Sequence, residues 1–211
     1  MAIDFFEILH TRARRYDTVY ISLQGKVKGQ RSDAEDACAI QGPPVFCVPG
    51  TPQGNHDDGI HPVSNVRIGP FDLIPEIDED LRFSYAAVNF GTSYNQKVFK
   101  KIMDGISDAT AFGLSIYQPQ SSGAWNQGND FTHKLHELQW GGCDGPVAND
   151  VATVLNRTIS NQYQSTLDAH TKDSGVWRQT SPIYEIESQD GCGKSSKYKI
   201  GWAIYRTSWK K

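Results

Sequence analysis

Residues 197–206 alternate between apolar and polar or small side chains, and this alternation limits the possible folds more than any other feature of the chain. One side of this segment carries Tyr198, Ile200, Trp202 and Ile204, whereas the other carries Lys197, Lys199, Gly201 and Ala203. A period of two is typical of an antiparallel β-strand that buries one face and exposes the other. The pattern therefore predicts a strand here, with Trp202 in a hydrophobic core.

Short runs of β-branched and aromatic residues predict further strands at 3–9, 19–25, 66–74, 81–89 and 182–186. Pro70 breaks the 66–74 run or restricts it to a sheet edge. These strands do not alternate with helices in a repeated βαβ pattern, which argues against a parallel sheet. We therefore expect a mainly β fold, an antiparallel β-sandwich formed by a single domain over residues 1–211. An α+β fold is the alternative.

The hydrophobic period changes to that of helices between residues 95 and 157. Apolar residues at helical spacing predict an amphipathic helix over 95–111. A second helix is predicted from Asp144 as the capping residue and Pro146 in the first turn. It would continue through Val147, Val151, Val154 and Leu155. We expect these helices to form an insertion at residues 95–157 that packs on one face or end of the sandwich.

Residues 29–62 are rich in glycine, proline and turn dipeptides, which predicts a long loop. Long loops inside compact domains are often functional. Within this one, His56, Asp57, Asp58 and His61 concentrate groups that could bind a ligand or a metal, or act as acids and bases. The alternative is a plain turn at Asp58-Gly59, in which Asn and Asp side chains bond to their own backbone.

The four cysteines lie at positions 38, 47, 143 and 192, without the close C-x-x-C pair that most zinc sites contain. The most economical pairing joins Cys38 to Cys47 and Cys143 to Cys192. The alternative is four buried free thiols. Disulfides favour a secreted or extracellular protein, although the first residues do not resemble a signal peptide and a cytoplasmic location is the alternative.

The densest acidic cluster is the segment Pro75 to Asp80. If the strands run up and down in sequence order, the connections alternate between the two ends of the sandwich. Asp17, Asp78 and Asp80 would then converge at one end, with the 29–62 loop at the other. Because calcium takes six to eight oxygen ligands, this convergence predicts a calcium site. The alternative is an acidic turn that only adds solubility.

Composition excludes two classes of partner. The net charge is −3, and the basic segment Arg12 to Arg15 is short enough to be a solvated edge, so nucleic acid binding is not expected. No stretch approaches the ~20 apolar residues that cross a bilayer, so no transmembrane segment is expected.

These observations favour a non-enzymatic recognition protein, in the manner of a secreted effector or toxin-like β-sandwich. Its end loops would bind a glycan, a lipid surface or a protein, with calcium as a ligand. Trp125, which lies outside the predicted elements, could stack on a sugar or enter an interface, or could close the end of the core. The alternative function is a metal-assisted hydrolase that uses the loop from His56 to His61.

Overall fold

The computed structural model describes residues 1–12, 17–27, 46–69, 80–90, 105, 143–155, 176–187, 192 and 195–205. For a few of these, including Cys47, Asp80 and Trp177, the backbone alone is described.

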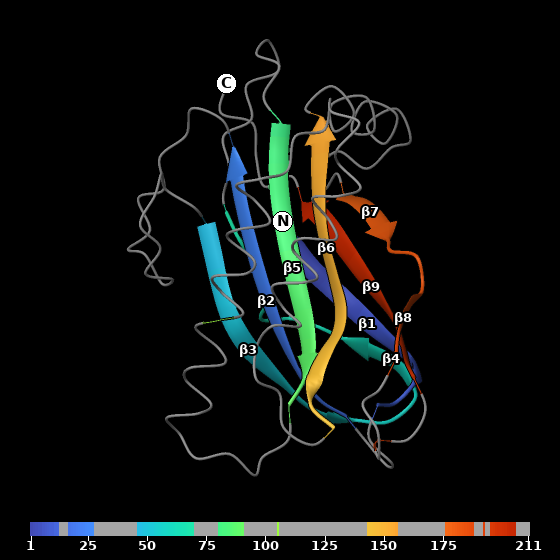
Figure 1. Ribbon diagram of the computed structural model, residues 1–211. Helices are drawn as coiled ribbons and strands as arrows, with labels where there is room; N and C mark the ends of the chain where they lie inside the picture. Colours follow the sequence, from blue (N-terminus) through green and yellow to red (C-terminus); the bar gives the residue numbers. More distant parts are fainter. Residues whose placement is uncertain are drawn as a thin grey trace, which may run out of the picture.

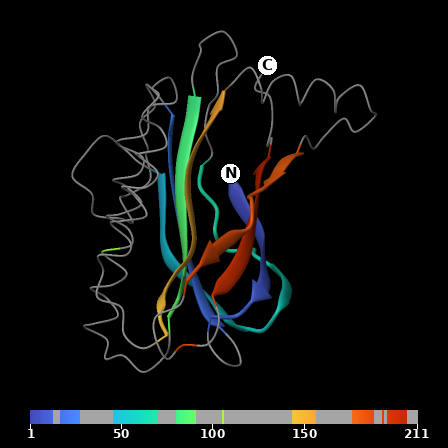
Figure 2. The ribbon, with the colours of Figure 1, turned by 45° about the vertical axis from the view of Figure 1, so that its right-hand side comes forward.

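The described residues form two antiparallel sheets that pack face to face, which confirms the predicted β-sandwich. Sheet A has the order β4-β1-β9-β7, with β8 also paired to β9, and sheet B has the order β3-β2-β5-β6. Figure 1 shows sheet B in front of sheet A, and Figure 2 shows the two layers from the side. The strands of sheet A are β1 (Ala2–His10), β4 (Gly59–Pro62), β7 (Val176–Thr180), β8 (Tyr184–Ile186) and β9 (Ser196–Tyr205). Those of sheet B are β2 (Asp17–Val27), β3 (Phe46–His56), β5 (Asp80–Asn89) and β6 (Gly145–Leu155).

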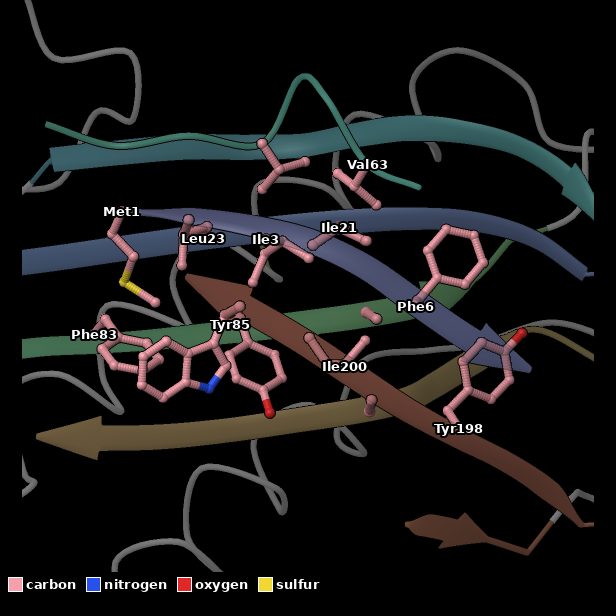
Figure 3. Packing of buried hydrophobic residues seen from close by; sticks show 14 of the residues in the cluster. Met1, Ile3, Phe6, Ile21, Leu23, Val63, Phe83, Tyr85, Tyr198 and Ile200 are labelled. Atoms are coloured by element: carbon pink, nitrogen blue, oxygen red, sulfur yellow. The ribbon is translucent and has the colours of Figure 1, made fainter. Parts of the chain in front are cut away.

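The core lies between the sheets and is formed by the alternating apolar residues of β1, β2, β5 and β9. Figure 3 shows Phe6 and Ile200 from sheet A facing Ile21 and Tyr85 from sheet B. Trp202 is 9% exposed, and its ring meets that of Phe83 edge to face with 4.8 Å between centroids. The prediction that Trp202 belongs to the core is therefore confirmed.

The second predicted helix is wrong, because residues 145–155 form β6. This segment pairs with β5 along its length, from Asn89↔Gly145 to Asp80↔Leu155. Its β-branched residues fit a pleated sheet, and the partner strand outweighs a weak local helix preference. Apart from Gly105, whose backbone is helical, the described residues form strands and their connections. The predicted helix at 95–111 lies outside the described residues apart from position 105.

The predicted long loop at 29–62 is wrong in its second half, where the chain forms β3 and β4. Strand β3 contains Pro49 and Pro52 and lies at the edge of sheet B, the position where a strand tolerates residues without an N–H group. Its pairing with β2 is interrupted by two register shifts. The predicted strand at 66–74 is reduced to a single bridge between Ala2 and Arg67, and its residues from Pro70 onward lie outside the described part.

One end of the sandwich, the lower end in Figure 1, contains two passages of the chain from one sheet to the other. The first leads from the end of β1 to the start of β2. The second leads from His56, the last residue of β3, to Gly59, the first of β4. Because both passages lie at this end, residues from four strands meet there.

Candidate functional site

The candidate site is the corner, which we define as residues 56–61, where the chain passes from β3 to β4. The end of β1 packs beside it: the backbone N–H of Thr11 donates to Asp58 Oδ1 at 3.1 Å, and His10 Nδ1 lies 4.0 Å from Asp58 Oδ2. Asp57 and Asp58 are exposed, and His56 is half-buried. The structure therefore brings the predicted ligand-binding residues His56, Asp57 and Asp58 together on one small surface.

His56 and His61 form a ring pair at the corner. Their ring centroids are 4.3 Å apart, and each ring lies 5.1 Å from the buried ring of Phe6. His56 Nε2 is 2.7 Å from the carbonyl oxygen of Gln53, and His61 Nε2 is 2.9 Å from that of Asp57. Because a carbonyl oxygen only accepts hydrogen bonds, each Nε2 carries a hydrogen, and Nδ1 is left to bind a proton or a metal.

The chemistry open to the corner is hydrogen bonding and proton exchange. Two histidines supply at most two metal ligands through Nδ1, whereas a catalytic zinc site uses three protein ligands. Within the described ranges, no three His, Cys, Asp or Glu side chains are grouped closely enough to hold a metal ion. Asp57 and Asp58 are better placed as exposed acceptors for the hydroxyl or N–H groups of a partner.

A buried polar network supports the corner from inside the sandwich. Asp17 is fully buried, and its Oδ2 accepts hydrogen bonds from the backbone N–H of Arg12 at 2.7 Å and from the Tyr198 hydroxyl at 2.6 Å. Arg12 is 2% exposed and donates through Nη1 to the Pro146 carbonyl oxygen at 2.9 Å. Asp17 is therefore held as a structural group and does not present its carboxylate to solvent.

The network also changes the protonation of its members. Burial, followed by the nearby charge of Asp17, raises the pKa of Tyr198 well above its usual value, so the hydroxyl stays a donor. Burial lowers the pKa of Arg12, while Asp17 and Asp144 act in the opposite direction. Sequence reasoning missed both residues. Arg12 was expected in a solvated edge, and the only signal for Tyr198 was that a buried hydroxyl needs a partner.

The predicted convergence of Asp17 with Asp80 is wrong. Val19 pairs with Asn89 and Val27 with Leu81, so Asp80, which begins β5, lies beyond the far end of β2. The separation along the strand is roughly 35 Å at about 3.3 Å per residue. Because β3 lies inside the segment predicted as a loop, the chain makes one more passage between the two ends than expected. Asp78 lies outside the described residues.

The predicted disulfide between Cys143 and Cys192 is confirmed, with its Cα atoms 5.1 Å apart. It lies at the same end as the corner, because the Cys143 carbonyl oxygen accepts from Asn89 Nδ2 at 3.1 Å at the end of β5. The same Asn89 accepts from the backbone N–H of Thr18 at 2.9 Å. Cys38, the side chain of Cys47, and Trp125 lie outside the described residues, so the second disulfide and the Trp125 contact stay predictions.

Comparisons with protein-family models, curated proteins and solved structures find no match to this chain. None of the described residues belong to a helix long and apolar enough to cross a bilayer. A disulfide-bonded β domain is consistent with an extracellular protein.

Proposed function

We propose that the protein is a non-enzymatic recognition protein of the extracellular space, which binds its partner through the corner. A secreted effector or toxin-like role fits this reading. The observation that carries the proposal is the position of Asp57 and Asp58, two exposed carboxylates on a tight turn that is bonded to Thr11.

The surroundings of the corner suit recognition. Beneath it, the buried contacts of Asp17 and the Cys143–Cys192 disulfide hold the ends of several strands together. A binding loop that is already held in position loses less conformational entropy when its partner arrives. Ile60 within the corner is 67% exposed and Leu9 of β1 is 36% exposed, and both supply apolar surface near the carboxylates. Polar groups beside apolar area are a common composition of binding surfaces.

The test is direct binding of labelled protein to a glycan array, to phosphatidylcholine vesicles with and without phosphatidylserine, and to an array of extracellular proteins. We expect saturable binding to one of these surfaces. The double substitution Asp57→Ala and Asp58→Ala should weaken it about tenfold, a loss of about 1.4 kcal/mol. Gln179→Ala, at an exposed position of β7 on the other edge of sheet A, should bind like the wild type. Unchanged binding by the double variant would refute the role of the corner.

The second candidate is a metal-assisted hydrolase, which the close approach of the His56 and His61 rings favours. Melting curves with zinc and with manganese separate the two functions. The recognition function predicts no stabilisation by zinc or manganese. A rise in melting temperature that is lost in both His56→Ala and His61→Ala would instead favour the hydrolase.

Melting curves with calcium test the expected calcium site in the same way. Asp17 is fully buried, so it could bind calcium only if this end of the sandwich opened. We therefore expect any calcium stabilisation to persist in an Asp57→Ala and Asp58→Ala variant and to disappear in Asp78→Asn.

A further inference from the structure

The outer face of sheet A, which points away from the core, carries a row of four residues that we call the platform: Pro62, Phe5, Gly201 and Thr180. The strand pairings place Phe5 opposite both Pro62 and Gly201, and Gly201 opposite Thr180. Directly opposite residues of an antiparallel pair share a face, and the neighbours Phe6 and Ile200 point into the core. The platform therefore crosses β4, β1, β9 and β7, over about 14 Å at about 4.8 Å per strand.

In the middle of the platform, the ring of Phe5 lies over Gly201. A Cβ atom at Gly201 would be only 2.0 Å from Phe5 Cε1 and 2.5 Å from Cζ. The ring therefore occupies the space that a side chain would take at this position, and it lies along the sheet. Phe5 is half-buried, while Pro62 and Thr180 are exposed. The row thus presents an aromatic ring between a proline and a hydroxyl group.

Ion pairs border the platform on both sides. Towards the corner, Lys199 Nζ lies 3.3 Å from Glu7 Oε2, and the two residues are directly opposite on β9 and β1. On the other side, Arg178 Nε donates to Asp4 Oδ2 at 3.2 Å, and the Tyr205 hydroxyl donates to Asp4 Oδ1. Each pair brings donors and acceptors together while its charges cancel. The Arg178 side chain is the most accessible of these groups at 64% exposed, whereas Lys199, Glu7 and Asp4 are 31%, 23% and 17% exposed.

We propose that the platform binds a neutral oligosaccharide. The apolar face of a sugar ring stacks on an aromatic ring, and its hydroxyl groups exchange hydrogen bonds with planar polar groups at the rim. The platform contains both kinds of group: the Phe5 ring lies in the middle, and paired carboxylate and cationic groups lie along its two sides. This inference rests on the proposed recognition function and names the class of its ligand.

The charges of this face favour a neutral ligand over a polyanion. Glu7 with Lys199 and Asp4 with Arg178 are internally neutral, and Arg67, which lies 5.6 Å from the centre of the Tyr205 ring, adds a single cation. A nucleic acid or an anionic membrane requires a cluster of unpaired cations. Ile60, opposite Glu7, continues the face towards Asp58, so a longer sugar chain reaches the corner.

The experiment titrates the full-length protein with neutral cello-, malto- and chito-oligosaccharides by isothermal calorimetry. We expect saturable binding to one of the three series, with little change between low and high salt. Phe5→Leu should bind about tenfold more weakly because it keeps apolar bulk but removes the ring, whereas Phe5→Tyr should stay within about threefold of the wild type. Arg178→Gln should weaken binding, and Gln179→Ala is the matched control. Melting temperatures establish that each variant is folded.

The outcomes separate this inference from the function on which it rests. One outcome is that none of the oligosaccharides binds, while the double substitution Asp57→Ala and Asp58→Ala abolishes binding of another partner. The platform is then not a sugar site, and the recognition function stands. If Phe5→Leu still binds the sugar while the corner substitutions abolish binding, the sugar binds at the corner, and the proposal of a sugar site on the platform is wrong. If high salt strongly weakens binding, the proposal of a neutral ligand is wrong. If neither the platform nor the corner variants change any binding, both proposals fail.

Discussion

At the scale of single residues, the end of the sandwich below the corner depends on a few buried polar atoms. Asp17 is fully buried and accepts from Arg12 N and Tyr198 Oη, and Arg12 is almost as deeply buried. A buried carboxylate costs free energy unless it is hydrogen-bonded, and losing one donor leaves part of that cost uncompensated. These residues therefore matter for stability, although none of them is exposed to a partner.

Tyr198→Phe should lower the free energy of unfolding by about 1–3 kcal/mol, because Asp17 loses a donor that water cannot replace. The matched control is Tyr205→Phe, which also removes a hydroxyl that donates to an aspartate, but on the outer face of sheet A. There water takes the place of the lost hydroxyl, and the cost should stay below that of Tyr198→Phe. Urea unfolding of the two variants measures both values. If both substitutions lowered the free energy of unfolding equally, water would have to reach Asp17, which contradicts its burial.

Gly145→Ala should destabilise the protein more than Gly54→Ala. Both glycines have positive φ, +147° and +100°, so both substitutions strain the backbone. A Cβ at Gly145 would also lie 3.0 Å from Arg12 Nη2, whereas one at Gly54 would meet nothing nearer than 3.7 Å. Thermal unfolding of the pair isolates the effect of the buried guanidinium. A larger cost at Gly54 would show that Arg12 moves aside freely.

At the scale of elements, the two sheets meet along the side where β6 faces β8. The hydroxyl groups of Tyr85 on β5 and Tyr184 on β8 are 2.6 Å apart, and Tyr184 donates to Asp150 Oδ2 on β6 at 3.4 Å. The backbone N–H of Val151 donates to Asp150 Oδ1 at 2.8 Å. Burial raises the pKa of Asp150 despite these two donors. This seam joins the sheets through polar contacts that the apolar pattern of the strands does not reveal.

The raised pKa of Asp150 predicts a pH dependence of stability. The folded protein holds this proton more tightly than the unfolded chain, whose aspartates have a pKa of about 3.9. The contribution of Asp150 is therefore complete below that pH and is lost as the pH rises through the higher pKa of the folded state. Asp150→Asn, which stays neutral, should gain stability relative to the wild type between about pH 4 and pH 7.

Denaturant unfolding of both proteins across this pH range measures the difference in their free energies of unfolding. Glu185→Gln is the control, because its effect on stability should depend on pH in the opposite direction. The hydrogen bond from Lys197 lowers the pKa of Glu185, so its contribution is present at neutral pH and is lost on acidification. Because Glu185 is exposed, this effect should be small. A difference between Asp150→Asn and the wild type that does not change with pH would contradict the raised pKa of Asp150.

At the scale of the whole molecule, the Cys143–Cys192 disulfide connects the start of β6 in sheet B with the turn before β9 in sheet A. It spans 49 residues in sequence. In the chain-entropy model, a loop of this length restricts the unfolded chain by about 4 kcal/mol. The disulfide therefore stabilises the contact between the two sheets at the end that contains the corner.

Replacing both cysteines, Cys143→Ser with Cys192→Ser, should lower the free energy of unfolding by about 2–5 kcal/mol, measured by urea unfolding without reductant. The double variant is a cleaner test than a reducing agent, because a reductant would also open the predicted Cys38–Cys47 disulfide. A loss under about 1 kcal/mol would mean that packing between the sheets already holds this end together.

The sequence predicts the fold correctly wherever a strand alternates apolar and polar residues. The strands β2, β5 and β9 alternate apolar and polar residues over most of their length, and local sequence contains that signal. Strand β6 does not, since its valines at 147, 151 and 154 have the spacing of one face of a helix, whereas in a strand Val154 lies on the opposite face from the other two. Only pairing with β5 decides between the two, because the backbone hydrogen bonds come from a partner far away in the sequence.

The candidate site divides in the same way. The cluster from His56 to Asp58 and the pairing of Cys143 with Cys192 follow from residue types and spacing, which the sequence contains. The burial of Arg12 and the bond from Tyr198 to Asp17, 181 residues apart, do not. Whether Asp17 lies at the same end of the sandwich as Asp80 or as Asp58 depends on how often the chain passes between the two ends. That number is set by β3, whose prolines look like a loop until an edge of sheet B accepts them as a strand.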